Sequence, residues 1–112
     1  MFAIGTEARL IIPAYDKAGE PVNVSEYQRN ACEIAGGATH SPGQGSWTDD
    51  NGNLICEPVH ILDIACEHGS DVERSLLDLA CEVCSDLNQD AVYFRDAGGT
   101  VHLVEQGDNG WG

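Results

Sequence analysis

The feature that most limits the fold of this chain is the spacing of apolar residues between positions 72 and 87. Val72, Leu76, Leu79, Val83 and Leu87 recur at intervals of three and four residues, which is typical of an amphipathic α-helix. Gly69 and Ser70 come directly before this pattern, at the place where a helix cap is expected. We therefore predict a helix, capped by Ser70 or Asp71, that buries one face against another layer.

The first third of the chain predicts a strand followed by a second helix. Apolar residues fall mostly on the even positions from 2 to 12, a period of two that is typical of a half-buried strand. After a polar loop, Ser25 is the predicted N-cap of a helix that ends at Gly36 and Gly37.

Two pairs of extended segments predict hairpins. Asn51-Gly52 favours a tight turn between Trp47 and the apolar run 54–66, where Pro58 indicates a bulge or an unpaired stretch. Residues 91–95 and 100–105 form the second pair, joined through the glycine-rich residues 96–99. Residues 39–46 are interpreted as a long polar loop.

The order strand, helix, hairpin, helix, hairpin predicts a fold of the α+β class. We expect a two-layer ferredoxin-like sandwich, βαββαβ plus a C-terminal edge strand, with two helices on one face of an antiparallel sheet. Residues 1–106 form a single domain in this prediction, and the glycine-rich residues 107–112 form a flexible C-terminal tail. The sheet face without helices is left open for partners or for a homodimer through the sheet.

The charge of the chain excludes several classes of partner. Nineteen acidic residues stand against five basic ones, a formal net charge of −14. Such a chain is repelled by nucleic acid and by anionic membranes, so we expect it to bind neither directly. It has no membrane-length apolar run, and its five cysteines match no disulfide pattern. We therefore expect reduced thiols and a cytoplasmic location.

One segment contains the candidate ligand-binding residues. Glycines let backbone amides approach a phosphate, and an exposed tryptophan can stack on a base. The candidates are His40, Gly43, Gln44, Gly45 and Trp47. The segment is neither a phosphate-binding loop of the Gly-Lys-Thr kind nor a dinucleotide fingerprint, and a purely connecting role stays open beside the ligand hypothesis.

Cysteine and histidine offer a further, catalytic interpretation. Cys81 and Cys84, together with Cys66 and His68, contain the donor types of a zinc site. A helical Cys-x-x-Cys lacks the turn that brings two thiolates to one metal, and buried cysteine is common. No local pattern brings a nucleophile, a base and an orienting carboxylate together. We therefore assign no catalytic or metal-binding residue and expect no cofactor.

The acidic residues themselves could bind a partner. The candidate contacts to a basic protein are Asp49, Asp50, Glu57 and Asp63. A surface of this kind would imitate the phosphates of a nucleic acid and occupy a cationic groove, with an affinity that falls steeply with salt. A solvated acidic surface without a partner is the alternative.

A set of glycines with one tryptophan and one glutamate resembles a pattern found in small phage-encoded proteins. The residues are Gly36-Gly37-x-Thr39, Gly43-x-Gly45-x-Trp47, Gly52 and Glu57. The proteins that this set resembles are uncharacterised and have a ferredoxin-like fold. The resemblance implies an accessory protein of a phage or mobile element, a class that includes inhibitors of host defence, and it implies no catalytic residue. The cytoplasmic location expected above is the host cytosol if a phage encodes the chain.

Three functions follow from these observations. The first is a non-enzymatic acidic binding protein that inhibits or modulates a basic host protein, as a host-defence inhibitor does. The second is a protein that binds or sequesters a small ligand or nucleotide through residues 43–47. The third is a small enzyme that uses a cysteine or a histidine.

Overall fold

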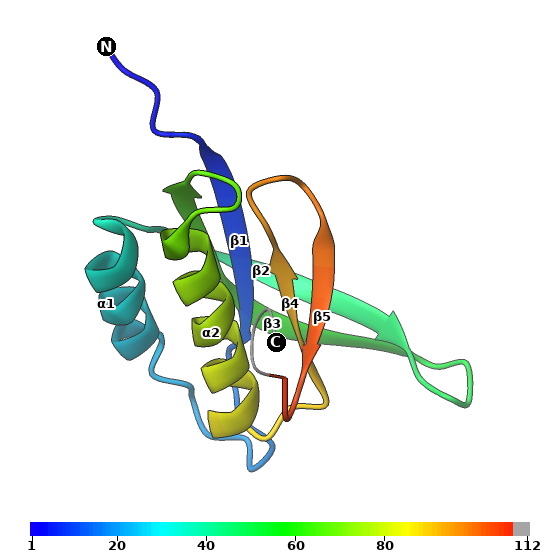
Figure 1. Cartoon of the computed structure of the whole chain (residues 1–112). Coiled ribbons are helices and arrows are strands. Elements are labelled where there is room, and N and C mark those ends of the chain that lie inside the picture. Colours follow the sequence, from blue (N-terminus) through cyan, green and yellow to red (C-terminus); the bar gives the residue numbers. More distant parts are fainter. Residues whose placement is uncertain (109–112) are drawn as a thin grey trace.

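The computed structural model describes residues 1–108, which form seven regular elements (Figure 1). In chain order they are β1 (Thr6–Pro13), α1 (Val24–Ala35), β2 (Thr39–Thr48), β3 (Leu54–Cys66), α2 (Asp71–Asp86), β4 (Ala91–Arg95) and β5 (Val101–Glu105). Of the tail predicted for residues 107–112, residues 109–112 lie outside the described part of the chain. Residues 107 and 108 follow β5 directly, and the backbone N–H of Glu105 donates to the Asp108 carboxylate.

The five strands form one antiparallel sheet in the order β2-β3-β1-β4-β5. This is the strand order of a ferredoxin-like βαββαβ unit, with β5 added as an edge strand beside β4. The α+β prediction is therefore confirmed, including the C-terminal edge strand. Both predicted hairpins are present, as β2–β3 and β4–β5.

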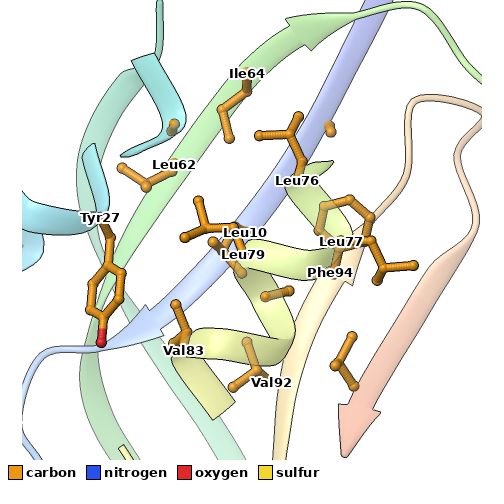
Figure 2. Close-up of a cluster of buried hydrophobic side chains, with 14 of the residues drawn as sticks. Leu10, Tyr27, Leu62, Ile64, Leu76, Leu77, Leu79, Val83, Val92 and Phe94 are labelled. Atoms are coloured by element: carbon orange, nitrogen blue, oxygen red, sulfur yellow. The ribbon is translucent and has the colours of Figure 1, made fainter. Parts of the chain in front are cut away.

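Both helices lie on one face of the sheet, and the core fills the space between the two layers (Figures 1 and 2). Leu10 of β1, Leu62 of β3 and Phe94 of β4 point into this layer, and each is at most 1% exposed. From α2, Leu76 and Val83 reach the same cluster. The spacing that predicts α2 is thus the spacing of its buried face, as expected for an amphipathic helix on a sheet.

Within residues 1–108, no helix covers the opposite face of the sheet (Figure 1). Arg9 and Asp63 pair across β1 and β3 on this face, with 2.7 Å between Arg9 Nε and an Asp63 carboxylate oxygen. The β2–β3 hairpin extends beyond the rest of the sheet, so both of its faces are accessible near the tip. The prediction of one open sheet face is confirmed.

The segment 39–46 is a strand, so its interpretation as a loop is wrong. All ten residues of β2 pair with β3, from Thr39 opposite Asp63 to Thr48 opposite Leu54. Glycine, serine and proline have low strand propensities, but pairing with a long apolar neighbour overrides such local preferences. Pro42 is tolerated because β2 is an edge strand.

Three local predictions also need correction. The N-cap of α1 is Asn23, and Ser25 lies inside the first turn. The first strand begins at Thr6, which leaves Phe2 and Ile4 exposed before it. The pairing of β3 with β2 continues through Pro58 without a bulge.

The two helix ends marked by the sequence are confirmed. Gly36 ends α1 in the left-handed conformation, with φ of 88°, and its N–H bonds to the Cys32 carbonyl. Glycine is favoured there because it adopts positive φ without strain. Ser70 caps α2 by accepting a hydrogen bond from the Glu73 backbone N–H.

In the described part of the chain, neither helix has the length and apolar character needed to cross a membrane.

Candidate functional site

The predicted ligand residues lie on both faces of β2 rather than on one surface. His40 is paired with the fully buried Leu62, so the even-numbered side chains of β2, Gln44 among them, belong to the helix side of the sheet. Trp47 is paired with Ile55 and points to the open face, because side chains alternate along a strand. The structure therefore brings Trp47, Gly43 and Gly45 together and separates them from His40 and Gln44.

Glu57 belongs to the same open face as Trp47. Glu57 is paired with Gly45, and Trp47 is paired with Ile55 two positions further along the ladder. The carboxylate and the indole are therefore diagonal neighbours on one face. Trp47 is 47% exposed and Glu57 is half-buried. Because Gly45 has no side chain, the surface over Glu57 is open on the β2 side.

Apolar side chains of β3 lean across the two glycines. A Cβ atom at Gly43 would lie 2.8 Å from Ile61 Cδ1, and one at Gly45 would lie 3.6 Å from Val59 Cγ1. The open face of the hairpin therefore presents, in order from the tip, the exposed ring of Trp47, the Glu57 carboxylate and the half-buried side chain of Ile61.

Two of the four acidic residues predicted to contact a partner already have internal contacts. Asp49 accepts hydrogen bonds from the backbone N–H groups of Asn53 and Asn51, both at 2.9 Å, and these bonds lower the pKa of its carboxyl group. Asp63 accepts two bonds from the Arg9 guanidinium, at 2.7 and 3.0 Å. Asp50 is exposed at the hairpin tip.

Two histidines meet on the helix side of the same hairpin. His40 Nε2 and His60 Nδ1 are 2.9 Å apart, and their ring centroids are 4.9 Å apart. Burial and the neighbouring His40 lower the pKa of His60. The sequence did not predict this contact, because it depends on β2 being a strand.

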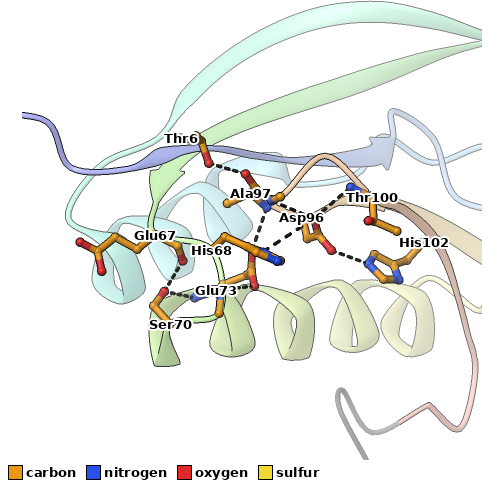
Figure 3. A network of polar contacts seen from close by, with 11 residues as sticks. Thr6, Glu67, His68, Ser70, Glu73, Asp96, Ala97, Thr100 and His102 are labelled. Atoms are coloured by element: carbon orange, nitrogen blue, oxygen red, sulfur yellow. Dashed lines mark hydrogen bonds and ion pairs between the residues drawn. The ribbon is translucent and has the colours of Figure 1, made fainter.

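A second cluster joins the start of α2 to the β4–β5 turn (Figure 3). Its centre is Glu73, whose side chain is fully buried. The Glu73 carboxylate accepts hydrogen bonds from the backbone N–H of Gly69 at 2.9 Å and of Ala97 at 2.8 Å. His68 Nδ1 lies 2.9 Å from the same carboxylate.

Asp96 is the second buried acid of this cluster. One of its oxygens accepts bonds from the backbone N–H groups of Gly98 at 2.9 Å and Thr100 at 3.0 Å. The other oxygen lies 2.9 Å from His102 Nε2. His68 Nδ1 is 4.0 Å from Asp96, so the two acids share one histidine.

The surroundings keep both acids ionised. Burial by itself would raise the pKa of Glu73, but the bonds from His68, Gly69 and Ala97 outweigh it and lower that pKa. Burial and hydrogen bonds oppose each other at Asp96 in the same way, and the bonds from His102, Thr100 and Gly98 leave its pKa lowered. The hydrogen bond to Glu73 raises the pKa of His68.

Sequence reasoning missed this cluster, although two of its parts match known local sequence patterns. Ser70-x-x-Glu73 is a capping-box pattern, and Asp96 begins a glycine-rich turn. Neither pattern shows that the two turns face each other across the end of the sheet.

Among residues 1–108, no cysteine belongs to a cluster of three possible metal ligands. Cys84 is buried in the core and its thiol contacts the Gln89 carbonyl at 3.3 Å, whereas Cys66 lies on β3. Burial raises the pKa of both thiols, which keeps them protonated.

Known proteins resemble this chain in structure only. No family model matches the sequence, and none of the curated proteins matches it. Two solved structures share the fold, a phage SAM lyase in complex with S-methyl-5'-thioadenosine and a phage SAM lyase in the apo state. The first has a TM-score of 0.65 at 17% identity, and the second has a TM-score of 0.63 at 18% identity. Each match covers 94% of this chain and 92% of the other.

These structures overturn the first functional prediction. We expected a non-enzymatic acidic protein that inhibits a basic host protein, but both of these similar structures are of an enzyme. The expectation that the chain is not an enzyme is wrong for the same reason. The expected resemblance to phage proteins agrees with both structures. A basic protein partner and a homodimer through the sheet stay predictions.

Proposed function

We propose that this protein is a phage-encoded enzyme that cleaves S-adenosylmethionine and releases S-methyl-5'-thioadenosine. The observation that carries the proposal is the shared fold over 94% of this chain with a SAM lyase bound to that thioadenosine. Fold alone does not define an activity, so the proposal also depends on a surface that suits the substrate.

The open face of the β2–β3 hairpin has the groups that such a substrate needs. The substrate combines an adenine ring, a sulfonium cation and an amino acid. Trp47 is exposed and can stack on adenine, an interaction worth roughly 1–3 kcal/mol per base. The net charge of −14 attracts a cationic substrate at long range.

Glu57 is assigned to the ammonium group of the amino acid part. We do not place Glu57 beside the sulfonium, because the reaction removes the positive charge there. A carboxylate at that point would stabilise the substrate more than the transition state. The half-buried side chain of Ile61, which leans over Gly43, offers the sulfonium an apolar contact instead. A poorly solvated site favours a step in which the negative carboxylate and the positive sulfonium of the substrate neutralise each other.

The reaction needs no second reactant. The bond between sulfur and the amino acid chain breaks, and its electron pair stays on sulfur, which becomes the neutral thioether of the product. The carboxylate of the substrate attacks the carbon that loses sulfur and closes a five-membered lactone. All atoms of the substrate are then found in the two products, as a lyase requires.

The proposal also connects the fold with the expected role against host defence. Removal of S-adenosylmethionine from an infected cell would deprive methyl-transferring enzymes of their methyl donor. Such an inhibitor acts without binding a host protein.

The test is to incubate the purified protein with S-adenosylmethionine and to quantify the thioadenosine by liquid chromatography and mass spectrometry. We expect thioadenosine to appear in proportion to protein concentration and in equal amount to the substrate consumed. Heat-denatured protein corrects for spontaneous breakdown, and S-adenosylhomocysteine, which has no sulfonium, should stay intact. Product formation no faster than with denatured protein would contradict the proposal.

A further inference from the structure

The cluster at the start of α2 contains three metal-ligating side chains in one place. One ligand atom from each of His68, Glu73 and Asp96 lies within 4.8 Å of the other two. The residues come from three different segments: the loop after β3, the first turn of α2 and the turn after β4. In Figure 3 these three side chains converge between α2 and the β4–β5 turn.

The two carboxylates are fixed before any ion arrives. Backbone N–H groups of Gly69 and Ala97 hold Glu73, and those of Gly98 and Thr100 hold Asp96. His102 Nε2 contacts the second carboxylate oxygen of Asp96, Oδ2, and so orients this carboxylate. Outer partners of this kind are a regular part of metal centres because they fix the ligand geometry.

The charge of the cluster also favours a dication. Glu73 and Asp96 have side chains at most 5% exposed, and carboxylates are expensive to bury without compensation. A divalent cation between the two carboxylates would compensate both negative charges.

The third ligand, His68, has a fixed ring position and lies next to a surface pocket. A Cβ atom at Gly98 would lie 2.7 Å from the His68 ring, so the ring packs directly over this glycine. A surface pocket of about 200 Å³, lined in part by His68, Gly69 and Glu73, adjoins the cluster. It gives room for the water molecules that complete the coordination of an ion held by three side chains.

We propose that His68, Glu73 and Asp96 bind one divalent transition-metal ion of the Zn²⁺ or Mn²⁺ type. One imidazole and two carboxylates suit these ions, since imidazole selects against Mg²⁺ and Ca²⁺. The ion lies between His68 Nδ1 and the carboxylates of Glu73 and Asp96. Its effect is to join the β3–α2 loop to the β4–β5 turn.

The probe is Mn²⁺ added to protein that has been dialysed against a chelator. Electron paramagnetic resonance measures the concentration of free Mn²⁺. The broadening of backbone amide signals in NMR spectra locates the bound ion. We expect one tightly bound ion per chain, with broadening centred on residues 68–70 and 96–98. Zn²⁺ should displace it and should raise the melting temperature of the metal-free protein.

The variants His68→Gln and His40→Gln separate a built site from general attraction to the acidic surface. His40 is a matched control because it is also an exposed histidine with a ring-nitrogen contact, to His60. His68→Gln should weaken Mn²⁺ binding by about tenfold or more, and His40→Gln should leave it unchanged. Equal binding by wild type and His68→Gln, or broadening centred elsewhere, would overturn the proposal.

Discussion

The buried carboxylate of Glu73 accepts a hydrogen bond of 2.8 Å from the backbone N–H of Ala97 and so joins α2 to the β4–β5 turn. The Ala97 carbonyl in turn accepts a hydrogen bond from the Thr6 hydroxyl at the start of β1. Three segments that are far apart in the sequence therefore meet at this end of the sheet (Figure 3).

Glu73→Ala should lower the free energy of unfolding by about 3 kcal/mol. The substitution leaves the buried N–H groups of Gly69 and Ala97 without their acceptor, which costs about 1–3 kcal/mol for each group that water cannot reach. Urea unfolding followed by circular dichroism measures the change. Glu82→Ala, an exposed position on the same helix, should stay within about 0.5 kcal/mol of wild type. Similar decreases in the free energy of unfolding for the two variants would contradict a stabilising role of the Glu73 hydrogen bonds.

The stability of the metal-free protein should decline as the pH rises from 6 to 8.5. The pKa of His68 is raised in the folded state, so its contribution is complete below the unfolded value of about 6.5 and is lost as pH rises through the folded value. The pKa values of Glu73 and Asp96 are lowered, so their contributions exist above about pH 4 and are lost as pH falls through the folded values.

Urea midpoints measured across this range in the presence of a chelator check the decline. In His68→Gln, the urea midpoint should no longer decline above pH 6, and its decrease at acid pH should stay as in wild type. A wild-type midpoint that does not change between pH 6 and 8.5 would contradict the ion pair between His68 and Glu73.

Gly98→Ala should displace the His68 ring without unfolding the domain. The new methyl group would lie 2.7 Å from the ring, and the ring can move because the side chain of His68 is 56% exposed. We expect a shifted His68 signal in NMR spectra and weaker Mn²⁺ binding. Gly37→Ala is the control, since an added Cβ there meets no atom within 4 Å. Unchanged His68 signals in Gly98→Ala would contradict the packing.

Trp47→Ala should weaken the binding of thioadenosine roughly 10- to 100-fold, as expected for the loss of one stacking contact. Isothermal titration calorimetry measures this change directly. Gln44→Ala is a matched control, because Gln44 lies on the same strand but faces the other side of the sheet. Equal losses in both variants would place the ligand elsewhere.

Glu57→Gln should weaken the binding of S-adenosylmethionine but not of thioadenosine. Only the substrate carries the ammonium group to which Glu57 is assigned, and the amide removes the charge while keeping the shape. The ratio of the two affinities, measured for wild type and variant, checks the assignment. A parallel loss for both ligands would mean that Glu57 contacts the nucleoside part.

Cys32 and Cys56 should react with a thiol reagent first in the folded protein. Both are exposed, whereas Cys66 and Cys84 are buried and have raised pKa values. Reagent kinetics combined with mass spectrometry of the labelled peptides identify the order. Fast labelling of Cys84 would contradict its position in the core.

Local patterns in the sequence were sufficient for the class of fold, although not for every strand. The apolar spacing of α2, the alternation in β1 and the turn at Asn51-Gly52 each reflect an interaction within a few residues. Gly36 and Ser70 mark helix ends for the same reason, since a cap is a local hydrogen bond. The order of these elements then predicted the two-layer sheet.

The strand β2 could not be predicted in this way, because its glycines, serine and proline favour a loop. Its hydrogen bonds come from β3, a partner that a local pattern does not contain. The candidate ligand surface depended on this strand, since only the alternation of β2 separates Trp47 from Gln44.

The sequence by itself determined the class of fold, the helix ends and the strongly acidic charge, all of which follow from composition and short-range contacts. Only the tertiary structure decided which polar groups meet. Trp47 approaches Glu57 because two strands pair, and His68 meets Glu73 and Asp96 because packing of α2 on the sheet brings two turns together. Contacts between distant segments depend on the register and packing of the whole domain, and no residue carries that information alone.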